Sequence, residues 1–378
     1  MQGKITRSKW TTWLAPGCSI SELDLAQVEW TEVFTACQTH DVAATLYARL
    51  RTCELLHKLP PQALKSLEED YQRAKRRALL WQRGLRVVLP ALVDSGVEVV
   101  PYKGAALAFL SYEDAAMRSM ADIDLWVDAK DMDKARGVLV GLGFEVRENA
   151  DRPIAQQARF DGEIGFYGKD IGVPLVELHW GVFPGEWVAR TTTVDRAALR
   201  QRLIPATLLG TQVHLMSPED HLIQVAIHAS ISHAFCSAAL RSLLDLVVIA
   251  QAGIDWSVVV QRSRNWRLAT VMGHTLALAG EIYQNAPMLA ASAQLISPWR
   301  LRILRSFANP DTILRKKPLD RSLAKWVYLL FAVDHGYDCL RLVARSLWPE
   351  GAWLHARYGD YSWRTRVRHL LGASQGHF

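Results

Sequence analysis

The stretch that decides the fold covers residues 97–127 and reads VEVVPYKGAALAFLSYEDAAMRSMADIDLWV. Its first six residues, VEVVPY, are rich in β-branched side chains and predict a strand. AALAFL predicts a short helix, and DIDLWV at the end of the stretch predicts a second strand. A strand, a helix and another strand in such close succession indicate an α/β or α+β core.

Further elements of the same kind follow this stretch. DMDKARGVLVGLG, residues 131–143, predicts a helix that stops at a glycine. Residues 163–167 and 173–180 read as two more strands, joined by a short turn through Gly168 and Gly172. The core therefore extends to about residue 180.

Helical patterns flank the core on both sides. Residues 21–37, 41–50 and 61–89 are rich in Ala, Leu, Gln, Glu and Arg and predict a helical lead-in. After about Leu209 helical patterns return with Ser217-Pro218, where Ser217 suits an N-cap and Pro218 the first helical position. We expect helices at 219–234, 238–252, 255–285 and 322–347. Because the sequence changes from helical to strand-containing patterns and back, we predict three domains. They are an N-terminal helical region (1–90), a core (91–212) and a C-terminal helical domain (213–378).

Composition indicates a folded globular protein. Half of the 378 residues are apolar and 22 % are charged, so a sizeable core is available. No run approaches the ~18 to 20 apolar residues of a membrane span, and the first residues lack the apolar stretch of a secretory signal. Five scattered cysteines without a Cys-x-x-Cys pair do not suggest a zinc or redox site. We therefore expect a cytoplasmic protein with reduced cysteines.

Positive charge is concentrated at the C-terminal end of the chain. From Ile296 onward there are 14 Lys or Arg residues against six Asp or Glu, whereas the whole chain has a net charge of +6. This basic tail is able to meet phosphates, an acidic peptide or an anionic surface. Ordinary solvated faces of amphipathic helices explain it equally well, because the arginines alternate with apolar residues.

Two aspartates carry the strongest chemical signal. On the strand DIDLWV, side chains alternate between faces, so Asp122 and Asp124 point the same way. Two carboxylates held this close repel one another unless a cation lies between them, and a divalent cation that prefers oxygen is the usual partner. Glu177 is a third ligand if its strand, VPLVELHW, lies beside the first. Three such carboxylates suit two Mg²⁺ ions.

A second signal is the pair Lys103-Gly104, between a predicted strand and a predicted helix. Free backbone N–H groups at such a turn attract phosphate, and Lys103 adds a positive charge. Arg118 is placed to reach the same phosphates or a carboxylate of the site. Each feature also has an ordinary explanation, because Asp-x-Asp pairs, exposed lysines and turn glycines are common. The order of these features along the chain is what favours a site that binds metal and phosphate.

Several histidines and one acid have two explanations each. His179 shares the strand face of Glu177 and either joins the site or packs beside the neighbouring tryptophans. His221, His228 and His233 lie along one predicted helix, where helix packing or hydrogen bonding is a better explanation than zinc binding. Asp245, on an apolar helix, either pairs with an arginine such as Arg241 or faces the cleft.

The stretch PYKGAALAFLSYEDAAMRSMADIDLWVDAKDMDKARGVLVGLGFE resembles the core of the bacterial uncharacterised nucleotidyltransferase family, a branch of the DNA polymerase beta nucleotidyltransferase superfamily. VELHWGVFP, SPEDHLIQVAIHA, RSLLDLVVIAQAGIDW and LWPEGAWLHARYG fit the same family. The resemblance runs from about residue 80 to the end. It implies an α+β fold in which a mixed sheet is flanked by helices. Asp122, Asp124 and Glu177 are then the catalytic, metal-binding acids, and Lys103, Gly104, Arg118 and His179 contact the nucleotide.

The activity that the resemblance implies is nucleotidyl transfer. An enzyme of this kind uses Mg²⁺ or Mn²⁺ and moves a nucleoside monophosphate from a triphosphate such as ATP to a hydroxyl or similar group. The acceptor would be a small molecule, a sugar or a peptide. One alternative is a binding protein for a peptide or acidic partner that kept the fold and lost turnover. Another is a nucleic-acid-modifying enzyme, although no recognisable nucleic-acid module is present.

Overall fold

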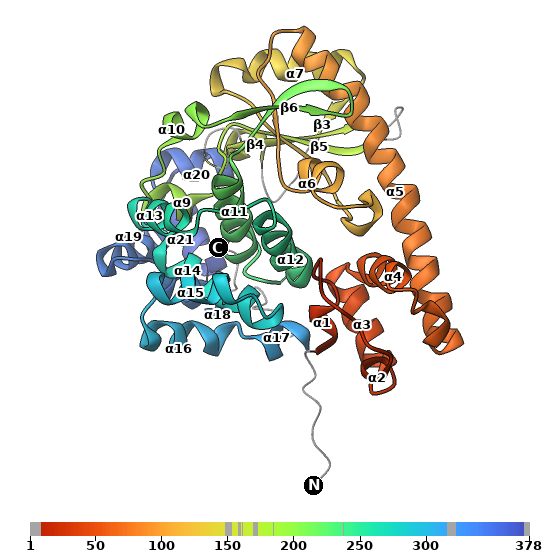
Figure 1. Cartoon of the computed structure of the whole chain (residues 1–378). Helices are drawn as coiled ribbons and strands as arrows, with labels where there is room; N and C mark the ends of the chain where they lie inside the picture. Colours follow the sequence, from red (N-terminus) through yellow and green to blue (C-terminus); the bar gives the residue numbers. More distant parts are fainter. Residues whose placement is uncertain are drawn as a thin grey trace.

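A computed structural model describes residues 9–147, 153–157, 160, 162–168, 173–183, 185–236, 238–315 and 323–373. Within these residues the fold is α+β: a five-stranded mixed sheet and a two-stranded hairpin are surrounded by helices (Figure 1). The predicted fold class is thereby confirmed.

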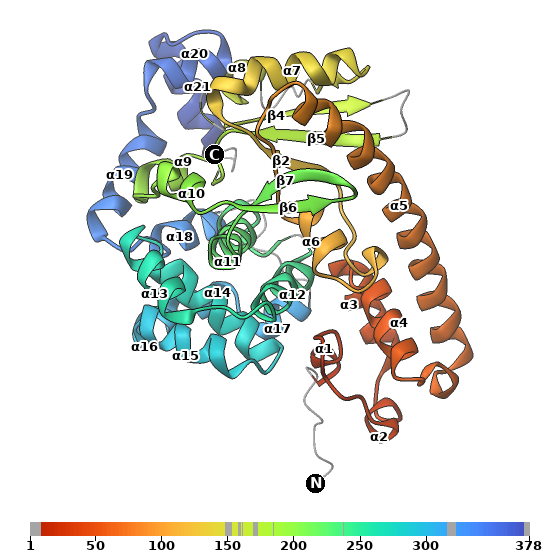
Figure 2. The same cartoon turned by 45° about the horizontal axis from the view of Figure 1, so that its top comes forward.

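The N-terminal part is helical, as expected. It contains short segments followed by one long helix: α1 (Lys9–Thr12), α2 (Glu22–Leu25), α3 (Trp30–His40), α4 (Ala43–Thr52), η1 (Leu56–Lys58) and α5 (Pro61–Asp94). Pro61 occupies the first position of α5, where its missing N–H costs nothing. One end of α5 packs on α3 and α4, and the other end packs on β5, β7 and α7 (Figure 2). This helix ties the N-terminal helices to the sheet and runs across the predicted domain edge at residue 90.

The core alternates short strands and helices from residue 100 to residue 179. Its elements are β1 (Val100–Pro101), α6 (Gly104–Leu110), η2 (Ala115–Met117), β2 (Ile123–Trp126), η3 (Ala129–Asp131), α7 (Met132–Gly141), β3 (Glu145–Val146), α8 (Ile154–Gln156), β4 (Glu163–Gly168) and β5 (Val173–His179). The strand order is β1-β2-β5-β4-β3. β2 and β5 are parallel, whereas the other neighbours are antiparallel. The strand of Glu177 therefore lies beside the strand of Asp124, as the sequence analysis required.

The two faces of this sheet have opposite character. Ile123, Leu125, Val176 and Leu178 are fully buried in an apolar cluster with residues of α5 and α7. Since strand side chains alternate, the residues between them point to the other face, toward the C-terminal helices. Asp124, Glu177 and His179 are on that face.

A β-hairpin between the sheet and the C-terminal helices was not predicted. After α9 (Glu186–Thr191) and α10 (Arg196–Gln201), the chain forms β6 (Ile204–Leu208) and β7 (Thr211–Leu215). The turn residues Leu209 and Gly210 both have positive φ, 51° and 91°, as a two-residue hairpin turn requires. A leucine at the first of these positions hides the usual Asn-Gly or Asp-Gly signal.

The C-terminal part is helical, with more breaks than predicted. Ser217 accepts the backbone N–H of Asp220 and caps the first helix, as predicted. The single helix expected at 255–285 is wrong, because a turn at Arg267, with φ 57°, separates α13 from α14. The helix expected at 322–347 is likewise divided, into α18 and α19. The elements are α11 (Pro218–Ile227), η5 (His228–Ser232), α12 (Ala239–Ala250), α13 (Trp256–Asn265), α14 (Ala269–Ile282), α15 (Ala286–Leu295), α16 (Pro298–Phe307), α17 (Pro310–Leu314), α18 (Leu323–Phe331), α19 (Gly336–Leu347), α20 (Gly351–Tyr358) and α21 (Trp363–Ala373).

Two general expectations can be compared with this fold. None of the helices in the described part of the chain is long and apolar enough to cross a membrane. All five cysteines are free thiols. The predicted domain edges at 90 and 212 stay predictions.

Candidate active site

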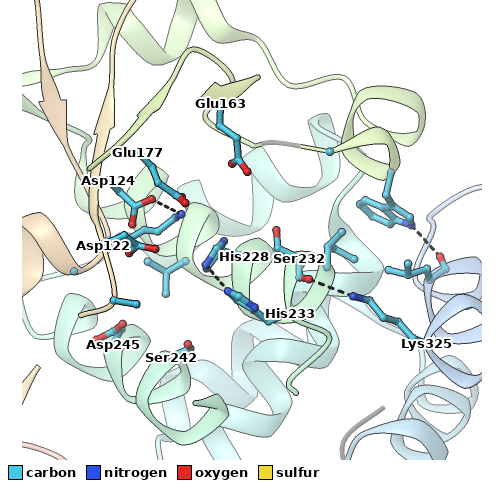
Figure 3. Close-up of a pocket in the computed structure, with 18 of the residues that line it drawn as sticks. Asp122, Asp124, Glu163, Glu177, His228, Ser232, His233, Ser242, Asp245 and Lys325 are labelled. Atoms are coloured by element: carbon cyan, nitrogen blue, oxygen red, sulfur yellow. Dashed lines mark hydrogen bonds and ion pairs between the residues drawn. The ribbon is translucent and has the colours of Figure 1, made fainter. Parts of the chain in front are cut away.

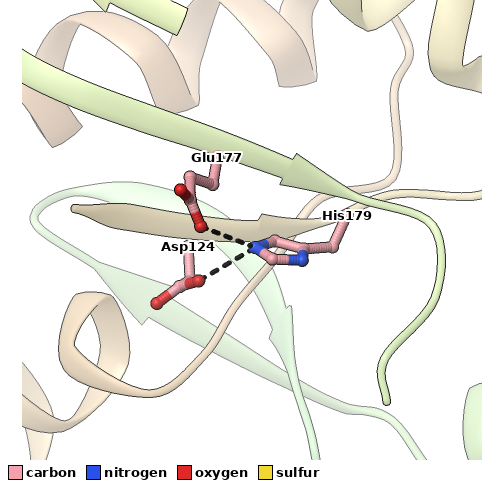
Figure 4. Close-up of side chains that lie close together, drawn as sticks. All are labelled: Asp124, Glu177 and His179. Carbon is pink, nitrogen blue, oxygen red and sulfur yellow. Dashed lines mark hydrogen bonds and ion pairs between the residues drawn. The ribbon is translucent and has the colours of Figure 1, made fainter. Parts of the chain in front are cut away.

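The pairing of β2 with β5 brings three predicted site residues together. Asp124 lies opposite Glu177, and His179 lies two residues further along β5 on the same face. One side-chain ligand atom of each residue lies within 4.8 Å of those of the other two (Figure 4). A single register thus assembles two carboxylates and one imidazole.

Asp124 is the buried centre of the cluster, with 3 % of its surface exposed. Its Oδ1 accepts hydrogen bonds from Lys103 Nζ at 2.8 Å and His179 Nε2 at 2.9 Å. Burial by itself raises the pKa of this carboxyl, but Lys103 and His179 outweigh burial and hold the pKa well below its usual range. Asp124 is therefore a carboxylate at any ordinary pH.

His179 is held by acids at both ring nitrogens. Nε2 bonds Asp124 and lies 3.6 Å from Glu177 Oε2, and Nδ1 lies 3.2 Å from Glu163 Oε2. Burial lowers the pKa of a histidine, yet the bonds to Asp124 and Glu163 prevail and raise the pKa to about 9. Glu163 is the site residue that sequence reasoning missed. Its position opposite His179 depends on the antiparallel register of β4 and β5, which no local motif announces.

Asp122 and Glu177 are the less neutralised acids of the site, although Glu177 Oε1 lies 3.8 Å from Nη1 of Arg147. Asp122 directly precedes β2 and is half-buried. Burial, and then the charge of Asp124, raises the pKa of Asp122 to about 6. Burial together with the charges of Asp122 and Asp124 raises the pKa of Glu177 to about 7. Carboxyls that hold protons so far above their usual pKa indicate that positive charge is missing between them.

The donor set fits a divalent cation. Carboxylate oxygens are the ligands that Mg²⁺ and Mn²⁺ prefer. Asp124 and Glu177 supply them within the close group that also contains His179, and Asp122 lines the same cavity without being a member of that group. Lys103 and His179 both bond Oδ1 of Asp124. The structure thus brings together two of the three predicted metal ligands, Asp124 and Glu177, with His179 as the third member of the group, and a metal role for Asp122 stays a prediction.

Lys103 has a strained backbone, with φ 49° and ψ −130°, a region that favours glycine. Its N–H donates to Nε2 of His221 at 3.0 Å. Burial lowers the pKa of His221 to about 4, so this ring is a neutral acceptor. A tertiary contact thus fixes the turn that directs Nζ to Asp124.

Gly104, the first residue of α6, is favoured by packing. A Cβ at this position would lie 2.6 Å from Cγ of Met120, which is far inside van der Waals contact. Glycine therefore lets the segment before Asp122 pack directly on the start of α6.

Arg118 contacts a carboxylate, although not one of the three candidate metal ligands. Its Nε donates to both carboxylate oxygens of Asp245, at 2.8 and 2.9 Å. Tyr112 also donates to Asp245, at 2.8 Å. Asp245 does pair with an arginine, but the predicted partner was wrong: Arg241 lies four residues away on the helix and instead bonds Asp41. The buried Arg118–Asp245 pair fastens the core to α12.

A cavity of about 720 Å³ opens over the cluster (Figure 3). Asp122, Asp124, Glu163 and Glu177 line one end of it. The other end lies between α9, α18 and α19 and is lined by Trp187, Lys325, Trp326, Leu329, Leu330 and Leu342. The cavity thus joins an acidic end to a mainly apolar end that also carries Glu186 and Lys325.

His228 and His233 lie in the middle of this cavity. They are brought together by the π-helical turn η5, with 2.9 Å between their Nε2 atoms. Burial is the main cause that lowers the pKa of both rings, that of His233 to about 4, so the pair is neutral. Helix packing or hydrogen bonding was the favoured prediction, and a hydrogen bond between the two rings is present. A regular helix would separate residues five positions apart, so the sequence did not predict this contact between the two rings.

Comparison with known proteins gives one match. No curated protein and no solved structure matches the chain. The family described as uncharacterised nucleotidyltransferase matches residues 26–284. The match starts earlier than the expected residue 80 and ends before the segment LWPEGAWLHARYG, and it contains every predicted site residue. Since the match covers more than half of the chain, the protein belongs to the uncharacterised nucleotidyltransferase family.

Proposed function

We propose that this protein is a Mg²⁺- or Mn²⁺-dependent enzyme that transfers a nucleoside monophosphate from a triphosphate, such as ATP, to a hydroxyl or similar group. The observation that carries the proposal is the set of carboxylates, Asp122, Asp124 and Glu177, at the end of a large cavity in a chain of this family. In the reaction the acceptor oxygen bonds the α-phosphorus. The bond from that phosphorus to the bridging oxygen breaks, pyrophosphate leaves, and the acceptor loses its proton.

Asp122, Asp124 and Glu177 would hold the metal ions. When bound, such ions neutralise the phosphates and activate the attacking oxygen. Lys103 and His179 keep Asp124 ionised and fix its orientation. The Lys103-Gly104 turn brings backbone close to the cluster, which suits a phosphate.

The apolar end of the cavity suits the body of the acceptor. The N–H groups of both tryptophans there are occupied, Trp187 by Leu329 O and Trp326 by Ser346 Oγ. The rings therefore present apolar surface, on which a small molecule, a sugar or a peptide side chain can pack. Nothing in the lining selects one of these three classes.

A binding protein without turnover is the second candidate, and one observation favours it. Asp124 already has two cationic partners, Lys103 and His179, within 2.9 Å. A site neutralised in this way holds its shape without a metal. Asp122 and Glu177, whose pKa values are raised, are the argument against it.

The test is thermal melting with Mg²⁺ or Mn²⁺ and each nucleoside triphosphate, for the wild type and the Asp122→Ala/Asp124→Ala variant. We expect a metal-dependent rise in melting temperature for the wild type alone. Release of labelled pyrophosphate in the presence of a pool of candidate acceptors then separates an enzyme from a binding protein. If no triphosphate binds in a way that depends on metal and on these aspartates, the proposed function is wrong.

A further inference from the structure

A second cavity shares part of its lining with the first one, close to Asp122 in the sequence. It has a volume of about 430 Å³ and lies between α5, the end of α3 and the start of α12. Its lining includes Arg77, Leu80 and Trp81 of α5. Met120, Ala121 and Arg241 line both cavities. Arg241 and the two residues that precede Asp122 therefore border both spaces.

Arg241 is a buried cation that is only partly satisfied. Its side chain is 18 % exposed, and its Nη1 donates to Asp41 Oδ2 at 2.5 Å and to Ser119 Oγ at 3.1 Å. Its Nε is buried and has no hydrogen-bond partner among the described residues. Burial, and then the nearby charge of Arg118, lowers the pKa of Arg241. Such a guanidinium gains from an additional anion.

The other cations of the large cavity already pair with an acid or lie far from the acidic end. Lys103 is paired with Asp124, and Arg118 is paired with Asp245 through both carboxylate oxygens. Lys325 lies near the apolar end, with Nζ 3.4 Å from the carbonyl oxygen of Ser232 (Figure 3). Arg241 lies beside the acids, and its partner Asp41 has a side chain that is 48 % exposed. An ion pair with so exposed an acid is weak and easily exchanged.

We propose that Arg241 binds the polyphosphate of the nucleoside triphosphate, a role that the sequence suggested for Arg118. The inference rests on the proposed function. The triphosphate then lies against Arg241, which lines both cavities, and next to Asp122. The nucleoside extends into the smaller cavity, where Trp81 and Leu80 offer apolar surface and Arg77 a further positive charge. The tryptophan end of the larger cavity is left for the acceptor.

Calorimetric titration with Mg²⁺ and α,β-methylene-ATP, a triphosphate that cannot be transferred, tests this proposal. The variants are Arg241→Gln, Arg241→Lys and Asp41→Asn. Loss of a hydrogen bond between charged groups amounts to roughly 10- to 100-fold in affinity, so we expect that loss for Arg241→Gln. We expect a smaller loss for Arg241→Lys, which keeps the charge but not the two-pronged geometry.

Asp41→Asn separates phosphate binding from a structural role. It breaks the same ion pair but leaves the arginine free, so the analogue should bind about twofold tighter. If Arg241 only stabilises the fold, Asp41→Asn weakens binding as Arg241→Gln does. Arg262→Gln is the matched control, because Arg262 pairs with a buried acid, Asp220, away from both cavities; its binding should equal that of the wild type.

The outcomes keep the two proposals apart. If the wild type binds the analogue in a way that needs Asp122 and metal, and Arg241→Gln binds equally well, the role of Arg241 is refuted and the proposed function stands. If the wild type does not bind, both are refuted. Repeating the titration with AMP adds a specific readout, because the effect of Arg241→Gln should be much smaller for a ligand that lacks the β- and γ-phosphates.

Discussion

Two buried histidines show how differently the two halves of this molecule treat charge. His179, on the sheet, and His274, in α14, are both fully buried. Acids at both nitrogens raise the pKa of His179 to about 9. His274 donates from Nε2 to the carbonyl oxygen of Ala308 and packs against the rings of Phe235 and Tyr328. Burial there lowers the pKa to about 4.

The two histidines are equally buried, so the difference between their pKa values comes from their electrostatic surroundings. Loss of water acts in the same direction on both rings and favours the neutral form. What differs is the immediate surroundings of the two rings: carboxylates contact His179, whereas a carbonyl oxygen and aromatic rings contact His274. The sheet face therefore concentrates negative charge beyond what its own cations neutralise, and the helical half provides an apolar support. Such an imbalance is typical of functional sites rather than of structural cores.

The largest expected effect is the loss of activity when Asp122, one of the acids of the site, is removed. Asp122→Ala removes a carboxyl that is half-buried and outside the Lys103–Asp124–His179 contacts. We expect transfer to fall by ~10³-fold or more, a loss of about 4 kcal/mol in the activation free energy, with little change in stability. Pyrophosphate release and urea unfolding measure the two quantities. Asp133→Ala, an exposed acid in the first turn of α7, is the control. Full activity of Asp122→Ala would show that the excess charge has no catalytic purpose.

The second effect concerns the neutralised part of the cluster. Asp124→Ala leaves Lys103 and His179 buried without their shared acceptor. Removal of one partner of a buried ion pair costs roughly 3–5 kcal/mol, so urea unfolding should show a large decrease in stability. The double variant Lys103→Met/Asp124→Leu removes both charges of the ion pair but leaves His179 without this acceptor, so it should recover part of that loss. If Asp124→Ala loses less than about 1 kcal/mol, the pair is not the structural centre of the sheet face.

Much of the sheet face could be predicted because strand geometry is regular. Alternation placed Asp124 on the polar face of its strand, and the parallel neighbour then brought Glu177 and His179. Asp122, predicted to lie on the same strand, directly precedes it. Glu163 was missed because its position follows from an antiparallel register between strands, which the local sequence does not encode. The choice of Arg118 over Arg241 as the partner of Asp245 also depends on tertiary packing.

The helical half was predicted less well, for physical reasons. The break at Arg267 contains neither glycine nor proline, the residues that usually announce a break. The π-helical turn that brings His228 to His233 is likewise invisible to a period of 3.6 residues. Burial of the next helix, rather than local propensity, decides where these helices end.

The pH dependence of stability tests the environment of His274 in the helical half. The folded pKa of His274, about 4, lies below the unfolded value of about 6.5. The folded state therefore binds fewer protons, and stability should be highest above pH 6.5 and decline as the pH falls toward 4. Tyr328, Phe235 and the more distant Arg305 face the ring, and none of them is an acid that offsets the charge.

Urea unfolding at pH 7.5 and at pH 4.5 provides the measurement. A shift of this size in the pKa of His274 corresponds to a loss of up to about 3 kcal/mol in the free energy of unfolding. His274→Asn should lower stability at pH 7.5 yet lose less than the wild type on acidification, because the other buried histidines remain in both proteins. An equal loss in the two proteins would mean that His274 does not titrate below its usual range.

The smallest effect lies where the two halves meet. Tyr112 donates to Asp245 at 2.8 Å, but Arg118 already bonds both oxygens of this acid. Tyr112→Phe should therefore cost only about 1 kcal/mol, measured by urea unfolding, and should leave nucleotide binding unaltered. Tyr361→Phe, on a side chain that is 63 % exposed, is the matched control and should change nothing. A loss above ~3 kcal/mol would mean that Asp245 depends on the hydroxyl as much as on the arginine. Removal of this hydroxyl would then destabilise the protein as much as removal of a single charged residue from the buried cluster on the sheet face.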